Sequence, residues 1–221
     1  MQGVLEWLAT RESFTVVQIG AYVGDSPGDP LHHFLRAKLP GYPARVAVLV
    51  EPVREYFEDL RDAYADLPTV HLENVAIAEE EGERDLYRLA PGVDPTDHGY
   101  GEWLAELSSL DPDRWDRWVR HDAAKDFWHR HRSVERVRCW TLEQLLERHD
   151  LAHVDLLQID TEGYDFEILK TIDFSRLRPR FINYERVHLH EDEAACRAML
   201  RDAGYVLFNW DVDTLAVAIT S

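Results

Sequence analysis

Short apolar runs that end at a glycine or a polar residue recur along this chain and constrain its fold most strongly. Residues 14–19 (FTVVQI), 46–50 (VAVLV) and 154–159 (VDLLQI) are runs of this kind, rich in valine, isoleucine and leucine. A strand that is apolar on both faces is typical of a parallel sheet with helices on each side. These runs are therefore expected to be strands of one parallel sheet.

Amphipathic helices are predicted between the apolar runs. Residues 31–39 and 53–64 place apolar side chains at helical spacing, and further helices are predicted at 164–171 and 194–203. The sequence Thr-Leu-Glu-Gln that begins at Thr141 is a capping box, which predicts the start of another helix. Strands and helices thus alternate, which predicts an α/β three-layer fold.

The remaining apolar runs are expected to complete the sheet. Residues 70–74 form a predicted strand that continues loosely through 75–77, and 181–184 form another. Two final runs, 205–208 and 215–219, are expected to pair across a short turn. The pattern predicts a mostly parallel sheet with one antiparallel strand.

One segment, about 91–133, differs in composition and is predicted to be a helical insertion within a single domain that spans residues 1–221. It opens with prolines and glycines, and Asp111 followed by proline is typical of a helix start. Short strands are expected on either side, at 86–89 and 134–139. The insertion contains four tryptophans, which either cover a pocket or pack on the sheet: Trp103, Trp115, Trp118 and Trp128.

Acidic side chains far outnumber basic ones. The chain of 221 residues has 24 Lys and Arg against 42 Asp and Glu, a formal charge of −18. Nucleic acids and anionic membrane surfaces are therefore not expected as partners, because both require a basic face. With two cysteines, no recognisable signal peptide and no apolar run near the ~20 residues of a bilayer span, a cytoplasmic location is predicted.

The ends of the predicted strands mark a candidate binding site. In an open parallel sheet, ligands bind outside the carboxyl ends of the strands. The residues at these ends provide a glycine turn, three carboxylates and an amide: Gly20, Glu51, Asn74, Asp160 and Glu185.

The glycine turn after the first strand narrows the choice of ligand. Gly20 and Gly24 have the spacing G-x-x-x-G, whereas dinucleotide-binding proteins use G-x-G-x-x-G, and Tyr22 occupies the place of the second glycine. This spacing favours a nucleoside ligand without a pyrophosphate. Glu51 is suited to accept hydrogen bonds from both ribose hydroxyls. A plain turn and an exposed acid at the end of a strand are the structural alternatives.

The most distinctive motif is Leu-Gln-Ile-Asp-Thr-Glu-Gly-Tyr-Asp at 157–165. It places the carboxylates of Asp160 and Glu162 two residues apart, where a strand turns into a helix. An Asx turn with a helix cap is the structural alternative. With this motif, the sequence resembles the FkbM-type S-adenosylmethionine-dependent methyltransferases. The matching segments are 17–24 (VQIGAYVG), 49–52 (LVEP), 74–77 (NVAI), 108–110 (SSL), 141–146 (TLEQLL), 154–163 (VDLLQIDTEG) and 182–185 (INYE).

This resemblance implies a class I methyltransferase (Rossmann-like) fold, with a mostly parallel seven-stranded sheet and a reversed last strand. It implies O-methylation of a hydroxyl on a natural product or a sugar, so that the partner is a small-molecule or carbohydrate acceptor; a homo-oligomer remains open. S-adenosylmethionine is the implied cofactor. The resemblance assigns ten residues to its site: Gly20, Ala21, Tyr22, Gly24, Glu51, Asn74, Val75, Ala76, Ser109 and Asp160.

An alcohol that accepts a methyl group must lose a proton, so a general base is expected. The candidates, in order of preference, are Asp160, His188, Glu185 and Glu162. Clustered carboxylates also suit Mg²⁺, but a metal is not favoured. No metal ligands are assigned, and no cysteine and histidine spacing resembles a zinc site.

Two other functions fit the same sheet. An NAD(P)-dependent oxidoreductase is the first alternative, although the missing second glycine of the turn counts against it. A non-catalytic binding module on a methyltransferase fold is the second. It is supported by Gln18 and Tyr22, where relatives usually carry an acid and an asparagine.

Overall fold

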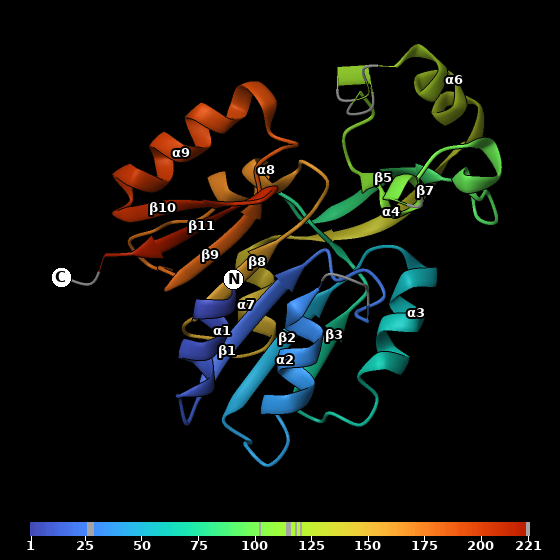
Figure 1. Ribbon diagram of the computed structural model, residues 1–221. Helices are drawn as coiled ribbons and strands as arrows, with labels where there is room; N and C mark the ends of the chain where they lie inside the picture. The colour runs from blue at the N-terminus through green and yellow to red at the C-terminus, as the bar shows by residue number, and fades with distance from the viewer. Residues whose placement is uncertain (26–28, 102, 114–115, 118, 120, 220–221) are drawn as a thin grey trace.

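The computed structural model describes residues 1–25, 29–101, 103–113, 116–117, 119 and 121–219. Within these residues the strands form a seven-stranded sheet in the order β10-β11-β9-β8-β1-β2-β3, and a four-stranded sheet in the order β4-β7-β5-β6 (Figure 1). The larger sheet consists of β1 (Phe14–Ile19), β2 (Arg45–Val50), β3 (Val70–Glu73), β8 (Leu156–Ile159), β9 (Phe181–Glu185), β10 (Tyr205–Trp210) and β11 (Asp213–Ala218).

The direction of its strands confirms the predicted mostly parallel sheet. Neighbouring strands from β3 through β2, β1 and β8 to β9 pair in parallel. The last strand of the chain, β11, is reversed and pairs antiparallel with both β9 and β10. Because β11 lies between them, the carboxyl end of β10 reaches the same edge of the sheet as the ends of the parallel strands.

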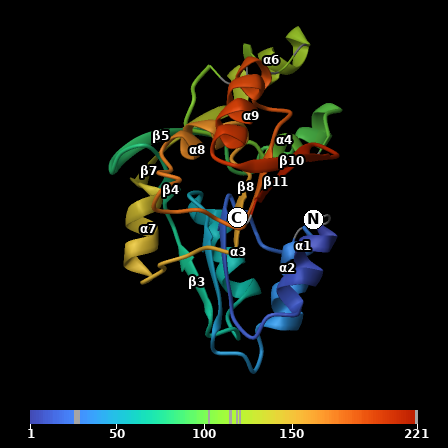
Figure 2. The same ribbon diagram turned by 90° about the vertical axis from the view of Figure 1, so that its left-hand side faces the viewer.

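Helices cover both faces of the larger sheet, as the alternating side chains of β1 require. Phe14 and Val16 pack into one apolar cluster with the helices of the first face, whereas Val17 and Ile19 join the cluster of the other face. Figure 2 shows α1 and α2 on one side of the sheet and α7 on the other. The first face carries α1 (Gln2–Ala9), α2 (Pro30–Lys38) and α3 (Arg54–Ala63); the second carries α7 (Leu142–Arg148), α8 (Asp165–Lys170) and α9 (Glu193–Asp202), which follows the short turn η2 (His190–Asp192).

The smaller sheet corrects one predicted strand. Residues 70–77 do not continue as one strand, because β3 ends at Glu73 and residues 76–77 pair with Cys139 and Trp140 in the other sheet. At this change of sheet, the side-chain amide of Asn74 donates hydrogen bonds to the backbone carbonyl oxygens of Glu51 at 2.8 Å and Pro52 at 3.0 Å, just after β2. The smaller sheet consists of β4 (Ala76–Ile77), β5 (Gly82–Leu89), β6 (Ser108–Ser109) and β7 (Arg132–Trp140).

The insertion predicted at 91–133 stands on the smaller sheet, with α6 above β5 and β7 in Figure 1. Trp128 is fully buried in its small apolar cluster, so this tryptophan packs the insertion, whereas Trp103 is 49% exposed. Trp115 and Trp118 lie outside the described residues, so the helix predicted to start at Asp111 is described only in part. The insertion also supplies the short strand β6, and its helices with described bounds are η1 (Pro95–His98), α4 (Trp103–Glu106) and α6 (Asp122–His131).

None of the helices in the described part of the chain combines the length and the apolar character that a bilayer span requires.

Candidate active site

A cavity of about 410 Å³ lies at the carboxyl ends of β1, β2 and β8. This is the edge at which an open parallel sheet binds its ligands, and the volume lies in the range of small-molecule sites. The smaller sheet contributes Leu86, Ser109 and the neighbouring Leu110 to its wall, and the β10–β11 turn contributes Trp210 and Val212. The cavity is therefore enclosed by three separate parts of the fold.

Carboxylates dominate the polar wall of the cavity. No lysine or arginine is found among the described residues that line it. A cavity with such an excess of negative charge favours a ligand that carries positive charge. The acidic side chains that line it are Asp29, Glu51, Glu106, Asp160, Glu162 and Asp213.

Gly20 lies where the ends of β1 and β8 are close together. The backbone of Asp160 donates a hydrogen bond to the carbonyl of Ile19 at 2.9 Å, and Gly20 adopts a φ of +82°. A Cβ at Gly20 would lie 1.7 Å from the carbonyl oxygen of Asp160. Only glycine fits this position, and the close approach brings the glycine turn and Asp160 to one wall of the cavity.

Glu51 lies at the end of β2, where the sequence analysis placed it, and connects two backbone segments. Its carboxylate accepts hydrogen bonds from the backbone N–H groups of Tyr22 at 3.0 Å and Val53 at 2.7 Å. Burial raises the pKa of Glu51 to about 7, although both hydrogen bonds favour the charged form. Glu51 therefore holds the glycine turn against the start of α3 while it lines the cavity.

The other residues assigned to the cofactor divide into two groups. Ala21, Tyr22, Val75, Ala76 and Ser109 line the cavity. Asn74 and Gly24 are not among the residues that line the cavity. The side chain of Asn74 donates to the backbone that follows β2, and a Cβ at Gly24 would lie 2.9 Å from side-chain atoms of Leu60 and Tyr64.

The turn after β8 is organised by Asp165, not by Asp160. The buried carboxylate of Asp165 accepts hydrogen bonds from the hydroxyl of Thr161 at 2.7 Å, from its N–H at 3.2 Å and from Gly163 N–H at 3.3 Å. Its second oxygen accepts from the N–H of Glu185 at 3.1 Å. These donors precede Asp165 in the chain, so they do not form the Asx turn considered for this motif, and no side-chain cap is described at the start of α8.

Asp160 is left facing the cavity. No side-chain hydrogen bond of Asp160 is found among the described residues, although its carboxylate lies within the wall. The residue is exposed to solvent, although the protein around its carboxylate removes part of its hydration. This partial desolvation, together with the charges of Glu185 and Glu162, raises the pKa of Asp160 well above its usual range. A carboxylate in these surroundings is a stronger base than an ordinary aspartate.

Three of the candidate bases form one cluster beside Asp160. The Nδ1 atom of His188 lies 2.9 Å from a carboxylate oxygen of Glu162 and 2.5 Å from one of Glu185. Burial alone would lower the pKa of His188, but the two carboxylates outweigh it and raise this pKa to about 9. Burial raises the pKa of Glu185 to about 7, against the opposing effect of His188. His188 is therefore protonated at neutral pH and acts as a counterion.

Of this cluster, Glu162 alone lines the cavity. Its backbone has a left-handed φ of 55°, which turns its side chain toward His188. The ligand atoms of the three residues are within 4.8 Å of one another. Because the raised pKa of His188 keeps its imidazole in the charged form, which does not ligate metals, we assign no metal ion to them.

Several residues of the cavity were not identified from the sequence. Asp29 caps α2 through a 2.7 Å bond from Leu31 N–H and accepts another from the side chain of Gln18 at 3.2 Å. An aspartate directly before a proline is a helix-start signal, so Asp29 was recognisable as a cap. No local sequence pattern marks Trp210 and Asp213 as site residues, because they reach the cavity only through the pairing of β10 with β11.

A comparison with protein families shows which family the chain belongs to. The methyltransferase FkbM domain matches residues 18–207, which include the glycine turn, the β8 motif and the end of β9. This chain belongs to the FkbM-domain methyltransferase family. The match confirms the resemblance seen in the sequence, and the strand order shows that this FkbM-domain methyltransferase has the class I fold. A methyltransferase of this family and fold uses S-adenosylmethionine.

Solved structures similar to this FkbM-domain methyltransferase have low sequence identity. The fibrillarin pre-rRNA processing protein of Methanococcus jannaschii is 11% identical, with 95% of this chain and 67% of that chain covered and a TM-score of 0.46. The precorrin-6y C5,15-methyltransferase of Geobacter metallireducens is 14% identical, with 98% and 84% covered and a TM-score of 0.47. A search of curated proteins finds no match.

Proposed function

We propose that this FkbM-domain methyltransferase transfers a methyl group from S-adenosylmethionine to a hydroxyl of a small-molecule natural product or a sugar. The observation that carries the proposal is the carboxylate of Asp160, which faces the cavity while Asp165 takes over the structural role in the same turn. A raised pKa at this position suits a group that must take a proton from an alcohol.

The residues of the cavity fit S-adenosylmethionine. When bound, it supplies a methyl group on a positively charged sulfonium, and it also carries an ammonium group, both of which suit a cavity lined by carboxylates. Glu51 would hold the ribose hydroxyls with the lone pairs that its two backbone bonds leave open. Val75 and Ala76 provide an apolar wall for the adenine.

Asp160 and the residues around it have different roles in the proposed reaction. The carboxylate of Asp160 accepts the proton of the acceptor hydroxyl, and Asp165 fixes the turn that aims it. The charge of His188 offsets part of the negative charge of Glu162 and Glu185, and the charge of these two carboxylates helps to raise the pKa of the base. Trp210 and Val212 lie at the wall where an acceptor would rest.

Binding measurements distinguish this function from the alternatives. Calorimetric titration with S-adenosylhomocysteine and with NAD should show binding of the first and none of the second. Transfer from labelled S-adenosylmethionine to a panel of hydroxylated sugars and polyketide alcohols then tests the acceptor class. Binding of NAD alone would support an oxidoreductase, and S-adenosylhomocysteine binding without transfer to any alcohol would contradict O-methylation.

Glu51→Ala is expected to weaken S-adenosylhomocysteine binding by about 1.5–3 kcal/mol, the usual contribution of hydrogen bonds to a charged group. In the parent protein, affinity should fall as the pH is lowered through about 7, because protonation removes acceptor capacity from the carboxylate. The variant should show no such pH dependence. Glu58→Ala, which removes an acid from the surface of α3, is the matched control and should behave like the parent. Equal affinities for the parent and Glu51→Ala would remove Glu51 from the ribose site.

Trp210→Ala is expected to raise the acceptor KM by roughly 5-fold, because an aromatic wall contributes on the order of 1 kcal/mol to a ring or chain that packs on it. The affinity for S-adenosylhomocysteine should stay unchanged. Phe208→Ala is the control, since Phe208 is 55% exposed on the same strand but does not line the cavity. Steady-state kinetics with any accepted alcohol provide the measurement, and equal effects of both substitutions would argue against a contact between Trp210 and the acceptor.

A further inference from the structure

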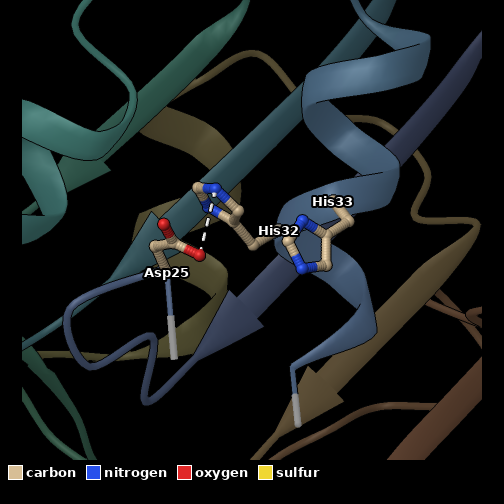
Figure 3. Close-up of side chains that lie close together, drawn as sticks. All are labelled: Asp25, His32 and His33. Carbon is tan, nitrogen blue, oxygen red and sulfur yellow. Dashed lines mark ion pairs between the residues drawn. The ribbon is translucent and has the colours of Figure 1, made fainter. Parts of the chain in front are cut away.

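A second cluster of metal-binding side chains lies outside the cavity. Asp25 follows the glycine turn, and His32 and His33 are consecutive residues of α2 (Figure 3). Each offers one ligand atom, and these atoms lie within 4.8 Å of one another. The spacing along the sequence gave no indication of this cluster, because a single aspartate seven residues before a histidine pair is not a recognised metal motif.

The distance between Asp25 and His32 is longer than that of a direct hydrogen bond. An oxygen of Asp25 lies 3.7 Å from Nε2 of His32, whereas the partly buried His149 contacts Glu73 at 3.0 Å. Zinc bonds nitrogen and oxygen at about 2.0–2.2 Å, which places neighbouring ligands of a tetrahedral site about 3.3 Å apart. The gap between Asp25 and His32 is close to this spacing, and a ligand atom of His33 lies within 4.8 Å of both.

His32 is an unusual buried imidazole. It is 4% exposed and packs against the ring of Tyr64, with 5.1 Å between the ring centroids. Its Nδ1 atom is buried without a hydrogen-bond partner among the described residues, and its Nε2 has the long contact to Asp25. Buried polar atoms are normally hydrogen-bonded, so neither ring nitrogen is committed in the usual way.

The surroundings permit an ion to enter and to bind. Asp25 and His33 are exposed, so the open side of the cluster faces solvent. Two imidazoles and one carboxylate are a donor set typical of zinc.

We propose that Asp25, His32 and His33 bind one zinc ion or a similar divalent transition metal, with water as the fourth ligand. The ion would tie the segment that follows the glycine turn to α2. Gly20, Tyr22 and Asp29, from the same connection between β1 and α2, line the cavity. Zinc binding should therefore strengthen cofactor binding, and by thermodynamic reciprocity the cofactor should strengthen zinc binding. This coupling rests on the proposed function, whereas the metal site does not.

Zinc titration of the chelator-treated, tag-free protein tests the site. Calorimetry should show saturable binding of one equivalent, and Co²⁺ should give the visible absorption bands of a tetrahedral site. His33→Ala and Asp25→Asn change exposed side chains and should fold normally, yet each should weaken zinc binding by about 100-fold or more, because even indirect partners of a ligand cost 10- to 100-fold. His153→Ala is the matched control, an exposed histidine that lies 3.8 Å from Asp155, and should bind zinc like the parent.

Absence of zinc binding in the parent protein, or equal zinc affinity in the parent, His33→Ala and Asp25→Asn, would overturn the proposal. The coupling has its own readout. S-adenosylhomocysteine affinity should rise about 5-fold or more with zinc in the parent and stay unchanged in His33→Ala. An unchanged affinity in the parent would refute the coupling and leave the site intact. Failure of S-adenosylhomocysteine to bind at all would refute the proposed function, and the zinc titration would still decide the metal site.

Discussion

Asp160→Asn is expected to lower the single-turnover rate of methyl transfer by about 10²–10⁴-fold, the usual contribution of a positioned general base. The affinity for S-adenosylhomocysteine should change little, because asparagine has the same shape and Asp165 holds the turn. The parent rate should fall as the pH is lowered through a pKa above the ordinary aspartate range, since protonation of Asp160 removes the base. The residual rate of the variant should lack this dependence.

Asp150→Asn provides the matched control for this substitution. Asp150 is an exposed turn residue with a left-handed φ of 54°, a conformation that asparagine adopts readily. Its replacement should leave rate and affinity unchanged. An Asp160→Asn rate within threefold of the parent would remove Asp160 from the mechanism. The preferred base would then be Glu162, because it also lines the cavity, whereas His188 is held as a cation.

The sequence was sufficient to predict the sheet wherever a strand carries its own signal. The runs that form β1, β2 and β8 are apolar on both faces, and this pattern arises from burial between two helix layers. The change of sheet after β3 could not be predicted in this way. It depends on where the side chain of Asn74 bonds and on the pairing of residues 76–77 with β7, and neither is a local property.

Helix α1 was missed for a related reason. Its buried side chains are Val4, Leu5 and Leu8, too few in eight residues to give a clear periodic signal. The helix is stabilised by packing that the local sequence does not display, including the edge-to-face contact of Trp7 with Phe181 at 5.3 Å.

The location of the candidate site could be predicted from the sequence, but the role of each residue in it could not. Gly20, Glu51 and Asp160 all lie at the cavity because the topology of a parallel sheet gathers its strand ends. The role of His188 depends on the left-handed backbone at Glu162, which turns a carboxylate toward the imidazole. A single sequence does not reveal such a backbone conformation at a non-glycine residue, so the histidine was ranked second among the bases.

Asp165→Ala is expected to have the largest effect on stability of the substitutions considered, a loss of about 3–5 kcal/mol in the free energy of unfolding. The side chain is fully buried and accepts bonds from two N–H groups and a hydroxyl of the β8 turn and from the N–H of Glu185. Alanine would leave these donors in the interior without an acceptor. Urea denaturation, monitored by tryptophan fluorescence, provides the measurement.

Asp173→Ala separates this effect from the ordinary cost of losing a turn-forming aspartate. Asp173 accepts bonds from the N–H of Ser175 at 2.9 Å and from its hydroxyl at 2.6 Å, but it is exposed, so water can replace both. Its replacement should cost far less. Near-equal losses for the two variants would mean that Asp165 does not organise the β8 turn, and the orientation of Asp160 would need another cause. A large loss for Asp165→Ala alone would show that the turn carrying the proposed base is held in place by a neighbouring buried carboxylate.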